Sequence, residues 1–160
     1  MATILKGLVE YEWTTPPLPQ FTEPLAALKE FTVQETLDIP QAKPDIEQIV
    51  KVKTDLVIFS TKVIKTPIGQ SLEKQTLTGW KVVIEGELKQ VIRYVANEPE
   101  QSVHGVHFNV PFSAFIVLPP DFEESQCITV EGYIEDVYAE QMGTRKIFKN
   151  VTLLLVAYIS

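Results

Sequence analysis

Long runs in which apolar and polar residues alternate constrain the fold of this chain more than any other feature. Between residues 31 and 39, four apolar residues and Glu35 share one side, and polar residues occupy the other. Between residues 80 and 94 the apolar residues keep the even positions, with Gly86 in the middle. A period of two is typical of strands that bury one face, and a glycine inside such a run predicts a bulge or bend. Further strands are indicated near residues 55–65, 106–112, 128–134 and 151–155.

The segment after the first run predicts the one helical element of the core domain. Pro40 ends the strand, because proline cannot donate a hydrogen bond to a neighbouring strand. Pro44 suits the first position of a helical turn, and Ile46, Ile49 and Val50 follow on one face at helical spacing. We therefore expect an all-β fold with one short helical lid. Its about seven to nine strands would form an antiparallel β-sandwich or an open barrel.

Residues 1–30 are predicted to form an N-terminal arm ahead of a β domain at residues 31–160. The arm contains one apolar strand, a connector with three prolines at residues 14–20 and a short helix at residues 21–30. The strand has two possible partners, its own sheet or the sheet of a neighbouring molecule. Because Trp and Tyr are enriched as interface anchors, we predict a subunit interface on this arm. Its residues are Leu5, Val9, Tyr11, Trp13 and Phe21.

The charge balance and the composition exclude several classes of protein. The chain has 160 residues and a net charge of −7, which argues against a nucleic-acid surface. No apolar run approaches the length of a membrane span, and the N-terminus lacks the pattern of a secretory signal. The single cysteine, Cys127, rules out an internal disulfide framework and leaves open a bridge between molecules, but we expect it to pack in or near the core.

Residue patterns that carry catalytic or metal chemistry are weak in this sequence. His104 and His107 form an H-x-x-H pair, but positions three apart in a strand point to opposite sides. We find no nucleophile motif and no phosphate-binding glycine pattern. We therefore expect no enzymatic activity, no cofactor, no metal site and no catalytic residues.

Four motifs, in order along the chain, resemble those of the SPOCS domain, a spore coat domain of endospore-forming bacteria. They are L-x-I-P-x-x-K-P-D-I-E-x-I from Leu37, V-x-I-E-G-E-L-x-x-x-I-x-Y-V-A from Val82, V-P-F-S-A-F-I-x-L-P from Val110 and V-E-G-Y-I-E-D-V from Val130. The resemblance covers roughly residues 31–160 and leaves the arm outside. It implies a role at the spore surface, for a protein assembled from the mother-cell cytoplasm.

Two functions follow from these observations. The first is a structural protein of the spore coat or of a surface appendage, which associates with other copies of itself by exchange of the N-terminal strand. Other coat proteins are further candidate partners. The second is a module that binds glycans of the spore envelope through exposed aromatic rings. A sheet-rich domain with an apolar strand on a stiff tether favours the first function.

Overall fold

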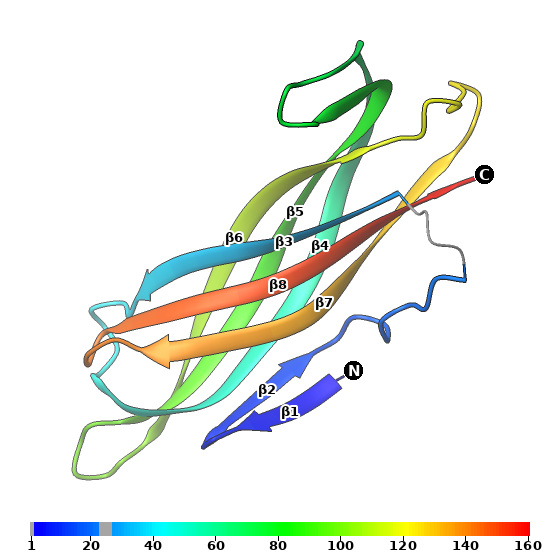
Figure 1. Ribbon diagram of the computed structural model, residues 1–160. Coiled ribbons are helices and arrows are strands. Elements are labelled where there is room, and N and C mark those ends of the chain that lie inside the picture. The colour runs from blue at the N-terminus through cyan, green and yellow to red at the C-terminus, as the bar shows by residue number, and fades with distance from the viewer. Residues whose placement is uncertain (1, 23–26) are drawn as a thin grey trace.

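The computed structural model describes residues 2–22 and 27–160, and within these ranges the chain forms eight strands and no helix (Figure 1). The strands are β1 (Ala2–Lys6), β2 (Val9–Trp13), β3 (Ala27–Asp38), β4 (Ile46–Gln70), β5 (Thr76–Ala96), β6 (Val103–Val117), β7 (Ile128–Gln141) and β8 (Lys146–Ile159). One sheet has the order β1-β2-β4-β5-β6 and the other the order β3-β8-β7. All pairs are antiparallel except β2 with β4. The prediction of an all-β fold of about seven to nine strands, a sandwich or an open barrel, is confirmed, and the two sheets form an open rather than a closed arrangement.

The predicted helical lid at residues 44–50 is wrong, because Ile46 already begins β4. The pairing of β4 with β5 shifts after Ile46 and again after Ile49. Each β-bulge adds one residue, so the next residue that faces the core comes one position later. Ile46, Ile49 and Val52 are accordingly all buried, three residues apart. A doubly bulged strand therefore produces the spacing that resembles one face of a helix.

The segment before β3 and the cysteine also depart from expectation. In the short helix predicted at residues 21–30, residues 27–30 are instead part of β3, and residues 23–26 lie outside the described residues. Cys127 is exposed rather than packed in the core. Its backbone N–H and carbonyl pair with those of Ser160 just before β7, so its position is fixed by the backbone.

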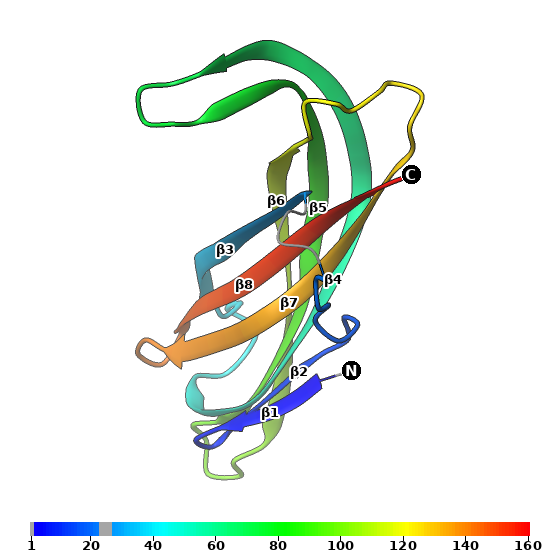
Figure 2. The ribbon, with the colours of Figure 1, turned by 45° about the vertical axis from the view of Figure 1, so that its right-hand side comes forward.

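The hydrophobic core lies between the two sheets and follows the expected period of two. On β5 every even-numbered residue from Val82 to Ala96 is buried, and on β8 the odd-numbered residues from Ile147 to Leu155 are buried. The expected bulge near Gly86 is present on its partner strand, where the register shifts between Ile58 and Ser60. The far ends of β4 and β5 extend beyond the second sheet and curl over (Figures 1 and 2).

The turn between β3 and β4 forms a corner where the chain crosses from one sheet to the other. Arg145, in the turn between β7 and β8, holds this corner by donating to the Asp45 carboxylate at 2.7 Å. Its guanidinium also donates to three backbone carbonyls of the corner, those of Ile39, Pro40 and Lys43. The Tyr94 hydroxyl donates to the carbonyl of Pro44 at 2.6 Å. The K-P-D-I motif is therefore a fixed link between the sheets.

Candidate assembly interface

Residues 2–13 form a hairpin, β1–β2, which we call the N-terminal hairpin. The sequence predicted one strand here, but the chain reverses at Gly7, which has a φ of +62°. Glycine adopts this conformation without the steric cost that a side chain would bring. The expectation of a single strand is therefore wrong, because a tight turn divides it in two.

The hairpin supplies two strands of the five-stranded sheet, and its β2 pairs in parallel with β4. Residues 10–13 pair with residues 51–54 of β4. Lys51 forms an ion pair with Glu12 at 3.0 Å, and this hydrogen bond lowers the pKa of Glu12. The Thr14 hydroxyl donates to the Asp55 carboxylate at 2.6 Å, directly after the last paired residue. Main-chain pairing and two polar contacts thus fix the register of this edge.

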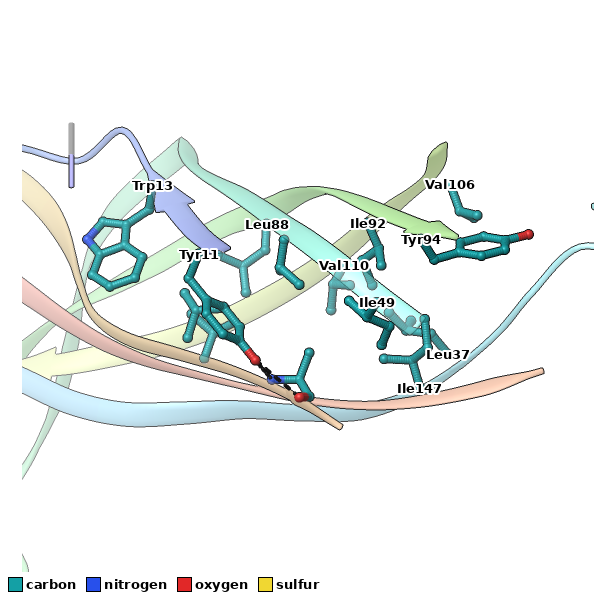
Figure 3. Packing of buried hydrophobic residues seen from close by; sticks show 14 of the residues in the cluster. Tyr11, Trp13, Leu37, Ile49, Leu88, Ile92, Tyr94, Val106, Val110 and Ile147 are labelled. Carbon is teal, nitrogen blue, oxygen red and sulfur yellow. Dashed lines mark hydrogen bonds between the residues drawn. The ribbon is translucent and has the colours of Figure 1, made fainter. Parts of the chain in front are cut away.

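Two aromatic side chains of β2 enter the core of their own chain. Tyr11 is 1% exposed and Trp13 is 5% exposed. The Tyr11 hydroxyl donates to the Ala139 carbonyl at 3.1 Å and accepts from the Ala139 N–H at 3.0 Å (Figure 3). Burial raises the pKa of Tyr11, while the bond to Ala139 acts in the opposite direction. Tyr11 therefore supplies both partners that the edge backbone of β7 needs at this position.

The same edge of β7 receives two more side chains from the N-terminal segment. The Lys6 ammonium donates to the Val137 carbonyl at 2.9 Å and also contacts Asp136. The Ile134 N–H donates to the Thr15 hydroxyl at 3.2 Å, at the bulge of β7. Unpaired backbone groups make an edge strand prone to pair with another chain. Lys6, Tyr11 and Thr15 therefore protect this edge without adding a strand to it.

The five residues predicted for the subunit interface fall into two groups. Tyr11 and Trp13 are buried within their own chain, so they are not available to a neighbour while the hairpin keeps this pairing. Leu5 is 74% exposed, Phe21 is also exposed, and Val9 is half-buried. The structure thus shows the first of the two possible partners, the chain's own sheet. No pattern in the sequence indicated the clamp formed by Lys6 and Thr15.

A mostly apolar groove runs between the hairpin, the connector and β7. Its volume is about 370 Å³, and Ile4, Trp13 and Leu18 contribute to its lining. Pro16, Pro17 and Ile134 also line the groove. The packing between the hairpin and the body is therefore incomplete on this side, although the edge hydrogen bonds are made.

The Tyr11→Phe substitution tests the bond to β7. It leaves the N–H and carbonyl of Ala139 without their partner in a buried place, so we expect a loss of about 1–3 kcal/mol in the free energy of unfolding. Urea denaturation measures this loss. Tyr138→Phe is the matched control, because Tyr138 lies on the same strand and is 41% exposed, and we expect a change within about 0.5 kcal/mol. Equal effects for the two variants would contradict the bond's role.

The structure brings no metal-binding group together in the part of the chain that it describes. His104 stacks on Tyr94 with ring centroids 5.9 Å apart, and His107 pairs with Val91 on β5. Residues 91 and 94 lie in opposite phases of β5, so the two histidines point to opposite sides, as expected. Residues 2–22 and 27–160 contain no helix that is long and apolar enough to span a membrane.

Comparison with models of protein families identifies the family of this chain. A family model described as "SipL, SPOCS domain" matches residues 45–142, which is more than half of the chain. The chain belongs to the SPOCS family. The match confirms the resemblance seen in the motifs and associates the protein with sporulation. The search of curated proteins and the search of solved structures found no match.

The SPOCS match begins at the corner held by Arg145 and covers β4, β5, β6 and β7. The N-terminal hairpin lies outside the matched residues. Its two docking strands, β4 and β7, lie inside them. The candidate interface therefore joins the N-terminal hairpin, which lies outside the SPOCS match, to the edges of β4 and β7, which lie inside the match.

Proposed function

We propose that this SPOCS protein is a non-enzymatic structural subunit of the spore surface, in a coat layer or an appendage. It associates with other copies of itself by exchanging the N-terminal hairpin between neighbours. The observation that supports this proposal is the way the hairpin docks. It pairs four residues of β2 in parallel with the edge of β4 and contacts the edge of β7 through side chains. Such edge addition is a general mode of recognition between chains.

Exchange requires no new contacts, because the hairpin of one copy fits the same edges on the next copy. Domain swapping is for this reason a low-cost route to association. The connector at residues 14–20 contains three prolines, which favour an extended chain that carries the hairpin away from its own body. A head-to-tail exchange continues into a fibre or lattice unless the rotation closes a ring.

The glycan-binding alternative has less support than assembly. It requires aromatic rings exposed on one face of a sheet. Tyr11, Trp13 and Tyr94 are buried, and Trp80 packs edge-on against Phe122 with ring centroids 5.3 Å apart. The rings that motivated this alternative are therefore mostly engaged within the chain.

A double-cysteine variant distinguishes pairing within one chain from exchange between chains. Glu12 and Lys53 are direct partners across β2 and β4, so cysteines at these positions are close enough to bond. In a Cys127→Ser background, Glu12→Cys with Lys53→Cys is oxidised and run on a non-reducing denaturing gel. Exchange gives a ladder of covalently linked chains. A single band at the monomer position, with both thiols consumed, contradicts the proposal.

The matched control moves one cysteine away from the pairing site. Glu12→Cys is combined with Ser71→Cys, which places the second thiol at the exposed tip of the β4–β5 hairpin. We expect no ladder from this variant. A ladder of equal intensity in the control would show that linkage arises from random collision.

A further inference from the structure

The end of β4 and the start of β5 form a two-stranded ribbon that projects from the rest of the molecule, and we call residues 66–79 the arm (Figures 1 and 2). Within the arm, β4 and β5 pair only with each other. No residue of the arm belongs to a hydrophobic cluster of the described residues. Yet Ile68 is 84% exposed and Leu72 is 100% exposed. Packing within the chain therefore does not explain the apolar side chains of the arm.

Hydrogen bonds fix the shape of the arm tip. The Ser71 N–H donates to the Gln75 carbonyl at 2.9 Å, and the Lys74 N–H donates to the Ser71 carbonyl at 3.0 Å. The Ser71 hydroxyl accepts from the Gln75 N–H at 3.0 Å. Lys74 adopts a φ of +66° at the end of this turn. Because the turn is already ordered, Leu72 and Lys74 can be presented to a partner with little further loss of backbone entropy.

The apolar groove beside the N-terminal hairpin has the complementary properties. Ile4, Trp13 and Leu18 line it, and Leu18 is 51% exposed. Glu135 also lines the groove, and its Oε1 atom is buried with no hydrogen-bond partner among the described residues. Burial raises the pKa of Glu135, and the neighbouring Glu30 raises it further. An unpartnered buried acceptor is unfavourable, so the groove lacks both an apolar cover and a donor for Glu135.

We propose that the arm tip of one copy docks into this groove on a second copy, with Leu72 against the apolar lining and Lys74 beside Glu135. The tip thus supplies both groups that the groove lacks, an apolar side chain and a cation. The other charge of the turn, Glu73, is exposed and stays in solvent. The arm lies far from the N-terminal hairpin in both views, so it cannot enter the groove of its own chain (Figures 1 and 2).

The contact joins two different surfaces, so it is head-to-tail and continues from copy to copy. A single turn in a groove is small compared with a stable interface, so it acts between copies that hairpin exchange or high concentration already holds close together. Arm docking therefore rests on the proposed self-association. It does not require hairpin exchange, because Ile4, Trp13 and Ile134 meet wherever a hairpin is docked.

Disulfide trapping between two different full-length variants tests arm docking. In a Cys127→Ser background, a tip chain carries Leu72→Cys and a groove chain carries Leu18→Cys, so each chain has one thiol. The two are mixed at high protein concentration and oxidised, and mass spectrometry identifies the dimer that joins residues 72 and 18. The control replaces the groove chain with Met142→Cys, an exposed position in the turn between β7 and β8. Burial of one leucine predicts about tenfold more mixed dimer than in the control, and equal yields overturn the proposal.

An exchange of charges tests the contact between Lys74 and Glu135. Lys74→Glu in the tip chain brings two acids together, and Glu135→Lys in the groove chain brings two lysines together. Because like charges in contact disfavour association, each change alone should slow trapping several-fold. The two changed chains together should recover the original rate, since opposite charges meet again. Misfolding of either variant would not be rescued in this way, and a failure to recover contradicts the pairing of Lys74 with Glu135.

The result is separable from that of the ladder experiment with Glu12 and Lys53. Trapping between residues 72 and 18 in a protein that gives no ladder supports arm docking and rejects hairpin exchange. A ladder without trapping supports exchange and rejects arm docking. Neighbouring residues of a strand face opposite sides, so Glu12 points away from the side of β2 on which Trp13 lines the groove. Arm docking therefore does not link Ser71→Cys to Glu12→Cys in the ladder control.

Discussion

The Gly86→Ala variant is expected to lose roughly 2–4 kcal/mol in the free energy of unfolding, the largest effect of any single added methyl group considered for this chain. A Cβ atom at Gly86 would lie 2.5 Å from the Val57 carbonyl oxygen and 2.7 Å from the Phe112 ring. The ring of Phe112, the direct partner of Gly86 on β6, occupies the space that the missing side chain leaves. The carbonyl belongs to a strand held on both sides of this point by pairing with β5, so it cannot move without breaking that pairing.

Two other glycines provide a graded control for this prediction. Gly105 on β6 has nothing within 4 Å of an added Cβ and no positive φ, so Gly105→Ala should change stability little. Gly132 on β7 would meet the Leu56 side chain at 2.4 Å, and a side chain can shift more easily than backbone. We therefore expect losses in the order Gly105, Gly132, Gly86, measured by thermal or urea unfolding. A loss at Gly105 as large as that at Gly86 would show that steric contact is not the cause.

The regular strands were predictable because their physical signal is local. An alternating run buries one side whatever strand lies next to it, and this is why the phase of β5 and the break opposite Gly86 were both expected. The beginning of β4 was misinterpreted because two bulges shift the phase of burial. A bulge depends on the partner strand, and its effect on spacing imitates a helix when only one strand is read.

The polar residues of the core were partly visible in the sequence. Glu35 was recognised on the apolar side of its run, and Lys149 lies in phase with Val151 and Leu153 on the buried side of β8. The hydrogen bond from Lys149 Nζ to the Thr54 hydroxyl depends on how the two sheets stack, which no local pattern specifies. The contacts of the hairpin with β7 were missed for the same reason, because they join residues more than a hundred positions apart.

The sequence left two partners open for the apolar N-terminal strand, and the pairing with β4 of the same chain does not remove the second. The docked hairpin makes the same contacts with β4 and β7 whether it belongs to the same chain or to a neighbouring chain. The choice between them depends on the connector, on protein concentration and on what else each copy meets. An experiment that separates the hairpin from its own body is therefore the sharpest test.

Deletion of residues 1–15 is expected to abolish stable folding of the isolated chain. Tyr11 and Trp13 are members of the largest buried cluster, together with Leu88 and Ile134 on opposite sheets. Loss of one large buried aromatic side chain costs about 3–5 kcal/mol. The free-energy cost of losing both side chains, together with the pairing to β4, approaches the whole free energy of unfolding of a typical domain, which is about 5–15 kcal/mol. Circular dichroism and urea denaturation should show no cooperative transition.

A synthetic peptide of residues 1–15, added to the truncated chain, should restore cooperative unfolding because it fills the vacant edges of β4 and β7. The matched control is the same peptide with Tyr11→Ala and Trp13→Ala, which keeps the backbone but loses the buried rings. In size exclusion the rescued complex should elute as one body with one peptide, since a free peptide occupies the site and carries no further subunit. The full-length protein should elute as larger species, because each hairpin brings another body with it. A rescued, folded complex that elutes as large as the full-length protein would show that copies are held together elsewhere, and hairpin exchange would then lose its role in assembly.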